Sequence, residues 1–219
     1  RYRIMPEASN SPPSLAIHIV SYEKNIWASA KAVLARARSW RRLEIGDWKL
    51  MKLRRIDGPC GHPDVGTPGI EVNSGSLGMG ISKGKGMAFA KSLTGRGGRI
   101  FVMTGDGELQ EGQIYETLQN AVHQKINNLN VIVDHNKVQS DKPVGEIVSL
   151  GDMEAKFRAF GWHVARCNGH DLQALDRVLA EFKTIADKPK ILIADTIKGR
   201  RVAFMEHPQA LADGKGFYR

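Results

Sequence analysis

The sequence has few cysteines and no long apolar run, and these absences exclude several classes of protein. Its 219 residues include only Cys60 and Cys167, which cannot build a disulfide framework and lack the spacing of metal ligands. No apolar stretch approaches the roughly 18–20 residues of a membrane-spanning helix, and the first residues show no apolar core of a signal peptide. We therefore expect a protein of the reducing cytoplasm that does not enter the membrane.

Acidic residues are scarce only in the first quarter of the chain. The whole sequence has a formal net charge of +9, of which residues 1–56 carry +8 and residues 57–219 carry +1. A basic stretch can bind nucleic acid, but these basic residues are interspersed with Trp27, Trp40 and Trp48 and form no nucleic-acid-reading motif. We expect a solvated basic face, no nucleic-acid partner, and a division into an atypical N-terminal segment (1–56) and a second unit (57–219).

The remaining composition is typical of a globular enzyme. A hydrophobic content of 42% is enough for a packed core, and this length predicts one domain with at most an appendage. Apolar residues recur at helical spacing over residues 25–43, which favours a helix. Residues 57–75 are rich in Gly and Pro, so we expect a loop there.

After residue 75, short apolar segments alternate with amphipathic ones. The expected strands are 99–104, 129–134, 162–166 and 190–196, and the expected helices are 76–93, 109–125, 152–160 and 171–186. Ser74 or Ser76 is the expected N-cap of the first of these helices, and Asp171 that of the last. Nearly all-apolar strands between helices predict an α/β fold with a parallel sheet covered by helices on both faces.

Polar residues follow the strands where a parallel sheet places its ligands. Gly105-Asp106-Gly107 comes directly after one strand, and Asp134-His135-Asn136 comes after the next. Consecutive strands of a βαβ unit end side by side, so we expect Asp106 and Asn136 to converge. Thr196-Ile-Lys-Gly199 follows the last strand and belongs to the same edge.

The chemistry of these side chains suits a metal ion and a phosphate. A carboxylate oxygen from Asp106 and an amide oxygen from Asn136 are ligands for Mg²⁺ or Ca²⁺. Gly105 and Gly107 leave room for phosphate to approach the backbone, and a helix expected to begin near Leu109 adds a positive end. The alternative is a tight turn in which Asp106 is only a cap; the second oxygen ligand at the end of the next strand favours the metal site.

These segments resemble those of a known family. Gly105-Asp-Gly107, followed by 28 residues and Asn136, resembles the thiamine diphosphate motif. Further segments are similar to the N-terminal thiamine diphosphate-binding region of transketolases, and together they span about two thirds of the chain, residues 57–207. These segments are Gly61-His-Pro63, Pro68-Gly-Ile-Glu-Val-Asn-Ser-Gly-Ser-Leu-Gly-Met-Gly80, Gly105-Asp-Gly-Glu-Leu-Gln-Glu-Gly112, Gly161-Trp162, Asn168-Gly-His-Asp171 and Thr196-Ile-Lys-Gly199.

The resemblance implies roles for particular residues at the cofactor. Asp106, Asn136 and the main-chain carbonyl of Val138 would hold the metal, while Gly107 and Asn136 would contact the diphosphate. The rings of the cofactor would lie against the backbone and side chains of Gly75, Ser76 and Leu77.

Three further residues acquire roles through the resemblance. His62 would contact the donor sugar near the reacting carbon, and Glu111 would take part in a proton relay at a subunit interface. Lys198 matches a lysine near the cofactor. Each has a simpler alternative: His62 could shape a turn, Glu111 could complement a helix dipole, and Lys198 could be solvated.

The function implied by the resemblance is ketol transfer. The chain would be a thiamine diphosphate- and Mg²⁺-binding transketolase-like subunit that moves a two-carbon unit from a ketose phosphate to an aldose phosphate, as in pentose phosphate metabolism. Its partner would be a pyrimidine-binding C-terminal subunit, because the active site of the family lies between two domains, and we expect a dimer of such pairs.

The sequence departs from the family pattern upstream of residue 57. Two histidine motifs that the family carries there are missing, and residues 1–56 contain only His18. Two alternatives therefore stay open: a non-catalytic or truncated thiamine diphosphate-binding subunit, or a related thiamine-dependent synthase such as one similar to deoxyxylulose phosphate synthase.

Overall fold

The computed structural model describes residues 16–17, 62, 72–73, 75–139, 142–202 and 206. The expected helix over residues 25–43 and most of the loop over residues 57–75 lie outside these ranges. The division of the chain at residue 56 also lies outside them and stays a prediction.

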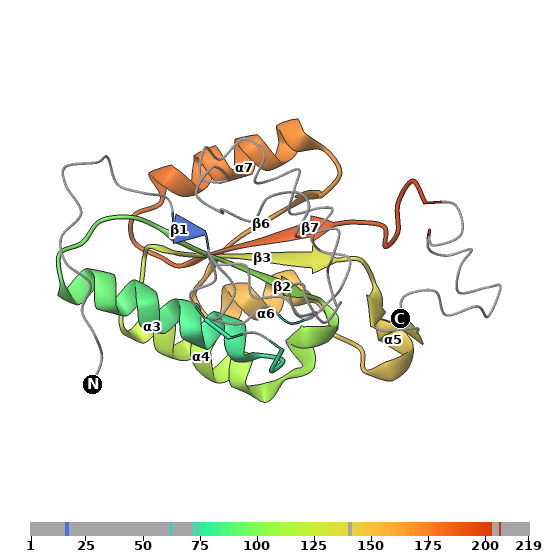
Figure 1. The fold of residues 1–219 in the computed structure, drawn as a ribbon, viewed down its shortest axis with the longest axis horizontal. Helices are drawn as coiled ribbons and strands as arrows, with labels where there is room; N and C mark the ends of the chain where they lie inside the picture. The colour runs from blue at the N-terminus through green and yellow to red at the C-terminus, as the bar shows by residue number, and fades with distance from the viewer. Residues whose placement is uncertain are drawn as a thin grey trace, which may run out of the picture.

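A five-stranded parallel sheet forms the centre of the molecule (Figure 1). Its strands lie in the order β1-β2-β3-β7-β6, and all four neighbouring pairs are parallel. The bounds are β1 (Ala16–Ile17), β2 (Ile100–Gly105), β3 (Leu129–His135), β7 (Lys190–Asp195) and β6 (His163–Asn168). The central strands β2, β3 and β7 are buried along almost their whole length, which explains why their sequences are continuously apolar.

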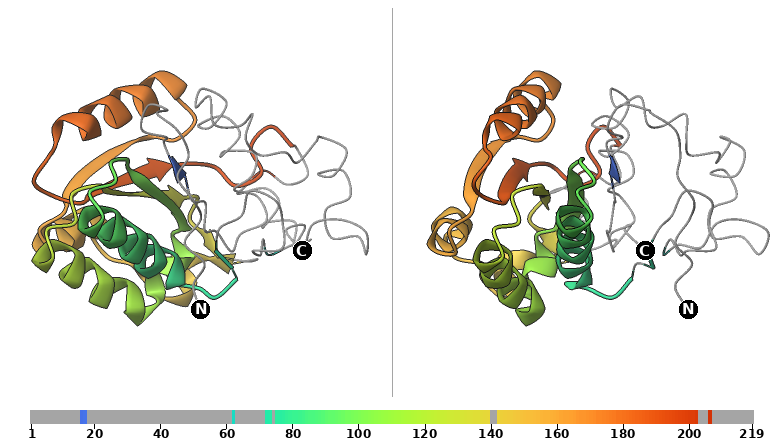
Figure 2. Two further views of the ribbon diagram at one scale, coloured as in Figure 1. Left: turned by 60° about the vertical axis from the view of Figure 1, so that its left-hand side comes forward. Right: turned by 90° about the vertical axis from the view of Figure 1, so that its left-hand side faces the viewer.

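Helices cover both faces of this sheet, as the sequence predicts (Figures 1 and 2). On one face lie α3 (Met79–Leu93), α4 (Gly112–His123) and α6 (Met153–Ala159), and on the other lies α7 (Leu172–Thr184). Each face has its own apolar cluster, with Leu118 and Phe157 among the buried residues of the first and Phe182 among those of the second. The predicted α/β fold is confirmed.

The first helix of this region begins three residues later than predicted. Its N-cap is Gly78, which has a left-handed φ of 77°, and no side chain caps the helix locally. The expected cap Ser76 contributes its carbonyl, which accepts a hydrogen bond from the Met79 N–H at 3.3 Å. The prediction of a serine side-chain cap at Ser76 is therefore wrong, and Ser74 lies outside the described residues.

The helix expected over residues 109–125 is divided in two. A 3₁₀ turn, η2 (Gly107–Gln110), comes first, and Glu111 then adopts an extended conformation before α4 begins at Gly112. The positive helix end expected near Leu109 is therefore the start of a single short turn.

A small hairpin after β3 gave no signal in the sequence. Strands β4 (Val138–Gln139) and β5 (Lys142–Pro143) pair in antiparallel fashion and lead into the one-turn helix α5 (Val144–Ile147). Two-residue strands are too short to show an alternating pattern. None of the helices in the described part of the chain is long and apolar enough to cross a bilayer.

Candidate cofactor and metal site

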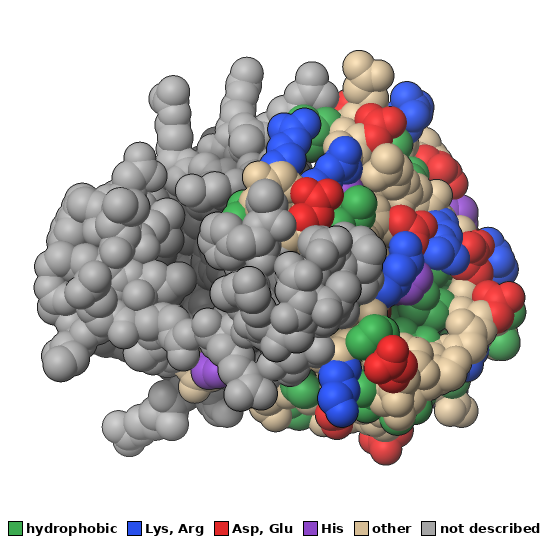
Figure 3. All heavy atoms as spheres, turned by 90° about the vertical axis from the view of Figure 1, so that its right-hand side faces the viewer, with side chains coloured by type: hydrophobic (Ala, Val, Ile, Leu, Met, Phe, Trp, Pro, Cys, Tyr) green, Lys and Arg blue, Asp and Glu red, His purple; other side chains and the backbone are tan. Residues whose placement is uncertain are grey.

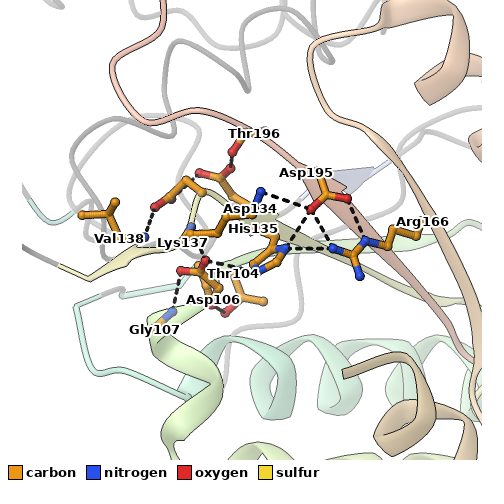
Figure 4. A network of polar contacts seen from close by, with 12 residues as sticks. Thr104, Asp106, Gly107, Asp134, His135, Lys137, Val138, Arg166, Asp195 and Thr196 are labelled. Atoms are coloured by element: carbon orange, nitrogen blue, oxygen red, sulfur yellow. Dashed lines mark hydrogen bonds and ion pairs between the residues drawn. The ribbon is translucent and has the colours of Figure 1, made fainter. Parts of the chain in front are cut away.

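The polar segments singled out in the sequence meet at the carboxyl edge of the sheet (Figure 4). In the parallel register, Gly105 at the end of β2 lies opposite Asp134 of β3, and Asp134 lies opposite Ala194 of β7. The segments that follow β2, β3 and β7 therefore begin at the same level, which brings residues far apart in the sequence to one place.

Asp106 joins the first two of these segments. Its side chain is fully buried, with Oδ1 accepting a hydrogen bond from the Gly107 N–H at 2.8 Å and Oδ2 accepting one from the Lys137 N–H at 2.6 Å. The Asp106 N–H donates to the Asp134 carbonyl at 3.2 Å. The convergence of the Asp106 and Asn136 segments predicted from the sequence is confirmed.

Asn136 is held in one orientation by its neighbours. Its Nδ2 donates to Asp134 Oδ2 at 3.0 Å, and its Oδ1 accepts from the Val138 N–H at 3.0 Å. The other carboxylate oxygen of Asp134 accepts a hydrogen bond from the Thr196 hydroxyl. Because Asp134 offers only acceptors at neutral pH, the amide nitrogen of Asn136 must face it and the oxygen must face the Val138 side.

This group of residues fits a hard divalent cation. A carboxylate, an amide oxygen and a main-chain carbonyl are ligands typical of Mg²⁺ and Ca²⁺, and Asp106, Asn136 and Val138 are all buried. A buried carboxylate is costly unless its charge is compensated, which a divalent ion at Asp106 would do. Among the described residues, no cluster of three or more His, Cys, Asp or Glu side chains could hold a metal, so the predicted oxygen set with its single acid is the candidate.

Gly107 needs to be a glycine because a side chain packs onto it. A Cβ placed there would lie 2.8 Å from Cγ of Gln139, far below van der Waals contact. Gln139 comes from β4, and its Oε1 is buried with no hydrogen-bond partner among the described residues. Sequence reasoning missed Gln139, and its place beside Gly107 follows only from the unpredicted hairpin.

The residues assigned to the rings of the cofactor lie next to the two predicted catalytic residues. Gly75 has a φ of 101°, and a Cβ there would lie 3.2 Å from Cγ of the exposed His62. Gly78 ends the same segment, and a Cβ there would lie 2.7 Å from Cβ of the exposed Glu111. His62 and Glu111 thus lie at the two ends of the segment that contains Ser76 and Leu77.

Lys198 lies in the turn after β7 and is only 6% exposed. This burial contradicts the alternative of a freely solvated lysine. The backbone just before it is fixed by His170, whose Nε2 accepts a hydrogen bond from the Ile197 N–H at 2.8 Å. Burial lowers the pKa of His170, with a smaller contribution from Arg200, so the neutral ring that this contact requires is the favoured form.

An ion-pair network borders the site beyond Asp106. Arg166 donates to both oxygens of Asp195, at 2.7 and 2.9 Å, and these hydrogen bonds lower the pKa of the Asp195 carboxyl to about 2. Asp195 also lies 2.9 Å from Nδ1 of His135, whose Nε2 is 4.0 Å from the Asp106 carboxylate. Burial lowers the pKa of His135, against the opposite effect of Asp195.

A cavity of about 470 Å³ opens beside this network. Its lining combines His135, Lys137 and Arg166 with the acid Glu154, and contains none of the site residues predicted from the sequence. Figure 3 shows the face at this edge of the sheet, where basic and acidic side chains are interspersed over the described part of the surface.

Comparison with known proteins agrees with this arrangement. Residues 42–210 match the family described as transketolase, thiamine diphosphate binding domain. The chain belongs to the transketolase family. Its similarity to one of the apulose-4-phosphate transketolase subunits, that of Phocaeicola vulgatus, is 40% identity over 146 residues, which are 67% of this chain and 52% of that protein.

A second relative and a solved structure extend the comparison. The 6-deoxy-6-sulfo-D-fructose transketolase subunit SqwG of a Clostridium species is 38% identical over 140 residues, which are 64% of this chain and 51% of that one. The chain therefore spans about half the length of these relatives. The transketolase of Campylobacter jejuni superimposes with a TM-score of 0.75 at 27% identity, covering 92% of this chain and 32% of that one.

Membership of the transketolase family confirms the fold and the thiamine diphosphate-binding domain inferred from the sequence. The roles of individual site residues stay predictions. What the structure adds is their position: the metal and diphosphate residues form one hydrogen-bonded group, while His62 and Glu111 lie along the segment beside it.

Proposed function

We propose that this transketolase-family chain binds thiamine diphosphate and Mg²⁺ as one subunit of a two-chain enzyme that transfers a two-carbon ketol unit from a ketose phosphate to an aldose phosphate. The observation that carries the proposal is the buried oxygen set of Asp106, Asn136 and Val138 at the carboxyl edge of the sheet. When bound, thiamine diphosphate supplies the carbanion chemistry of the transfer.

The residues of this chain would anchor the cofactor and move protons around it. Asp106, Asn136 and the Val138 carbonyl would hold the metal, and Gly105 and Gly107 would let the diphosphate approach the backbone. Lys198, held in its turn by the backbone contact to His170, would lie near the cofactor.

His62 and Glu111 would act on the exposed side of the site. Both are exposed, at opposite ends of the segment from Gly75 to Gly78. His62 would contact the donor sugar near the reacting carbon, and Glu111 would relay protons where a second subunit docks. Exposed positions suit both roles, since substrate and partner must reach these side chains.

A partner subunit is part of the proposal. Two relatives are named as transketolase subunits, and the chain spans about half of each. The partner would be a pyrimidine-binding transketolase subunit, in a dimer of such pairs.

The test is a reconstitution. The purified chain is mixed with a co-expressed pyrimidine-binding transketolase subunit, thiamine diphosphate and Mg²⁺, and ketol transfer is measured from a panel of ketose phosphates. Turnover that requires all four components is expected. Metal-dependent cofactor binding without turnover on any donor would contradict the enzyme and leave a non-catalytic binding subunit, whereas no cofactor binding at all would contradict both.

The donor panel should span the chemistry printed in the names of the relatives. Those names specify apulose 4-phosphate and 6-deoxy-6-sulfofructose, so the panel includes one phosphorylated and one sulfonated ketose besides a common ketose phosphate. A preference for the sulfonated donor would correct the substrate class and keep the ketol-transfer mechanism.

A further inference from the structure

Glu108 is a buried acid for which the sequence suggested no role. It follows Gly107 in the turn η2, and only 7% of the residue is exposed. A carboxylate in such a position is costly unless strong donors surround it. Its contacts therefore indicate what its burial stabilises.

The Glu108 carboxylate joins two segments that are 30 residues apart. Its Oε1 accepts a hydrogen bond from the Gly78 N–H at 2.9 Å, and its Oε2 accepts one from the Thr104 hydroxyl at 2.6 Å. Thr104 lies in the buried strand β2, so it fixes the carboxylate to the frame of the sheet. Hydrogen bonds to an ionised acceptor are roughly twice as strong as neutral ones.

Gly78 is the point at which the other segment needs support. It begins α3 in a left-handed conformation with no local side-chain cap. Its N–H lies inside the turn that Met79 closes by donating to the Ser76 carbonyl. Glu108 therefore holds the turn that follows Ser76 and Leu77.

The phosphate side of the site is anchored without Glu108. Asp106 accepts hydrogen bonds from Gly107 and Lys137, and its own N–H donates to Asp134. Removing the Glu108 carboxylate would thus release the Gly75–Gly78 segment and leave the Asp106 loop in place.

We propose that Glu108 is a positioning residue that fixes the Gly75–Gly78 segment at a set distance from the Asp106 loop, so that both ends of the cofactor are held at once. This inference rests on the proposed cofactor site and deepens it. It assigns Glu108 to the ring end of the cofactor, although in sequence it adjoins the diphosphate end.

Two probes separate the two ends of the cofactor. Binding of Mg²⁺-pyrophosphate and of Mg²⁺-thiamine diphosphate to the full chain is measured by titration calorimetry for the wild type, Glu108→Ala and Glu108→Gln. The control is Glu116→Ala, which changes an exposed acid on α4. We expect Glu108→Ala to weaken thiamine diphosphate binding at least about tenfold, the effect of losing a hydrogen bond to a charged group, and pyrophosphate binding less than about threefold.

The glutamine variant is the conservative rescue. Its side-chain carbonyl can accept from the Gly78 N–H, and its amide can donate to the Thr104 hydroxyl. Both affinities should therefore stay within about threefold of the wild type. Hydrogen exchange at residues 75–80 without ligand should rise in Glu108→Ala and stay at the wild-type rate in Glu108→Gln and Glu116→Ala.

The outcomes distinguish this inference from the proposed function. Equal losses for both probes, or no loss for either, would overturn the role of Glu108. A wild-type chain that binds neither probe would overturn the cofactor site as well. If Glu108→Ala does not fold, Thr104→Val, which removes the hydroxyl that fixes the carboxylate, must give a loss confined to thiamine diphosphate for the proposal to stand.

Discussion

At the carboxyl edge of the sheet, buried polar groups from different strands bond to one another, whereas at the amino edge several have no partner. Asp106, Asp134 and Asn136 form one connected group. At the amino edge, within the described residues, Arg99 Nη1 and Asn128 Oδ1 are buried without a hydrogen-bond partner. Burial of polar atoms alone therefore does not mark a site; the convergence of oxygen acceptors from two neighbouring strand ends does.

The amino edge also carries an isolated buried cation. Lys190 begins β7, is only 2% exposed, and donates to the Asn127 carbonyl. Burial lowers the pKa of Lys190, and nearby Arg99 lowers it further. We assign this edge to stability and the carboxyl edge to ligand binding, and substitutions at each edge can break that division.

The largest effect is expected for Asp106→Ala at the carboxyl edge. Loss of the carboxylate should weaken Mg²⁺-dependent thiamine diphosphate binding more than about 100-fold, since mutating groups one step further from a metal already costs 10–100-fold. Calorimetric titration with and without Mg²⁺ measures this. The control Asp187→Ala removes an exposed acid near the amino edge and should bind as the wild type does. Metal-dependent binding that survives in Asp106→Ala would refute the metal assignment.

An intermediate effect, of the opposite kind, is expected for Lys190→Ala. The substitution leaves the Asn127 carbonyl without its donor, so the free energy of unfolding should fall by about 1–3 kcal/mol, as measured by urea denaturation. Cofactor affinity should not change, because the residue lies at the far edge of the sheet. Lys188→Ala, at an exposed neighbour, should alter stability by less than about 0.5 kcal/mol. A loss of cofactor affinity in folded Lys190→Ala would remove the distinction between the edges.

The smallest effect is expected in the pH dependence contributed by His170. Its pKa in the folded chain lies below the unfolded value, because the ring is buried and beside Arg200. As the pH falls below about 6.5, the unfolded state takes up this proton first, and the free energy of unfolding decreases until the folded-state pKa is passed. In His170→Gln, which can still accept from the Ile197 N–H, the decrease between pH 7.5 and pH 5 should be smaller. An unchanged decrease would show that His170 does not contribute.

Much of the fold could be predicted because its signals are local. Apolar runs mark β2, β3 and β7, and Asp171 caps α7 through the N–H groups of Gln173 and Ala174, as predicted. The start of α3 could not be predicted, because the acceptor for the Gly78 N–H belongs to Glu108, 30 residues further on. Capping patterns describe neighbours in sequence, and this contact is between neighbours in space.

The site divides in the same way. Asp106 and Asn136 were identifiable because each follows a strand directly, and parallel strands end at one edge. Gln139 was not, because its place over Gly107 depends on the two-residue strand β4. The burial of Lys198 was not readable either, since a lysine after a strand is as often solvated as enclosed.

By itself, the sequence determined the alternation of strands and helices and the motif that places a carboxylate and an amide at successive strand ends. Only the tertiary structure decided how these groups meet. The register that sets Gly105 opposite Asp134 brings Asp106 to the Lys137 N–H, and the packing of α3 on the sheet brings Gly78 to Glu108. The physical reason is that hydrogen bonds act over about 3 Å, and only folding brings groups 30 residues apart within that distance.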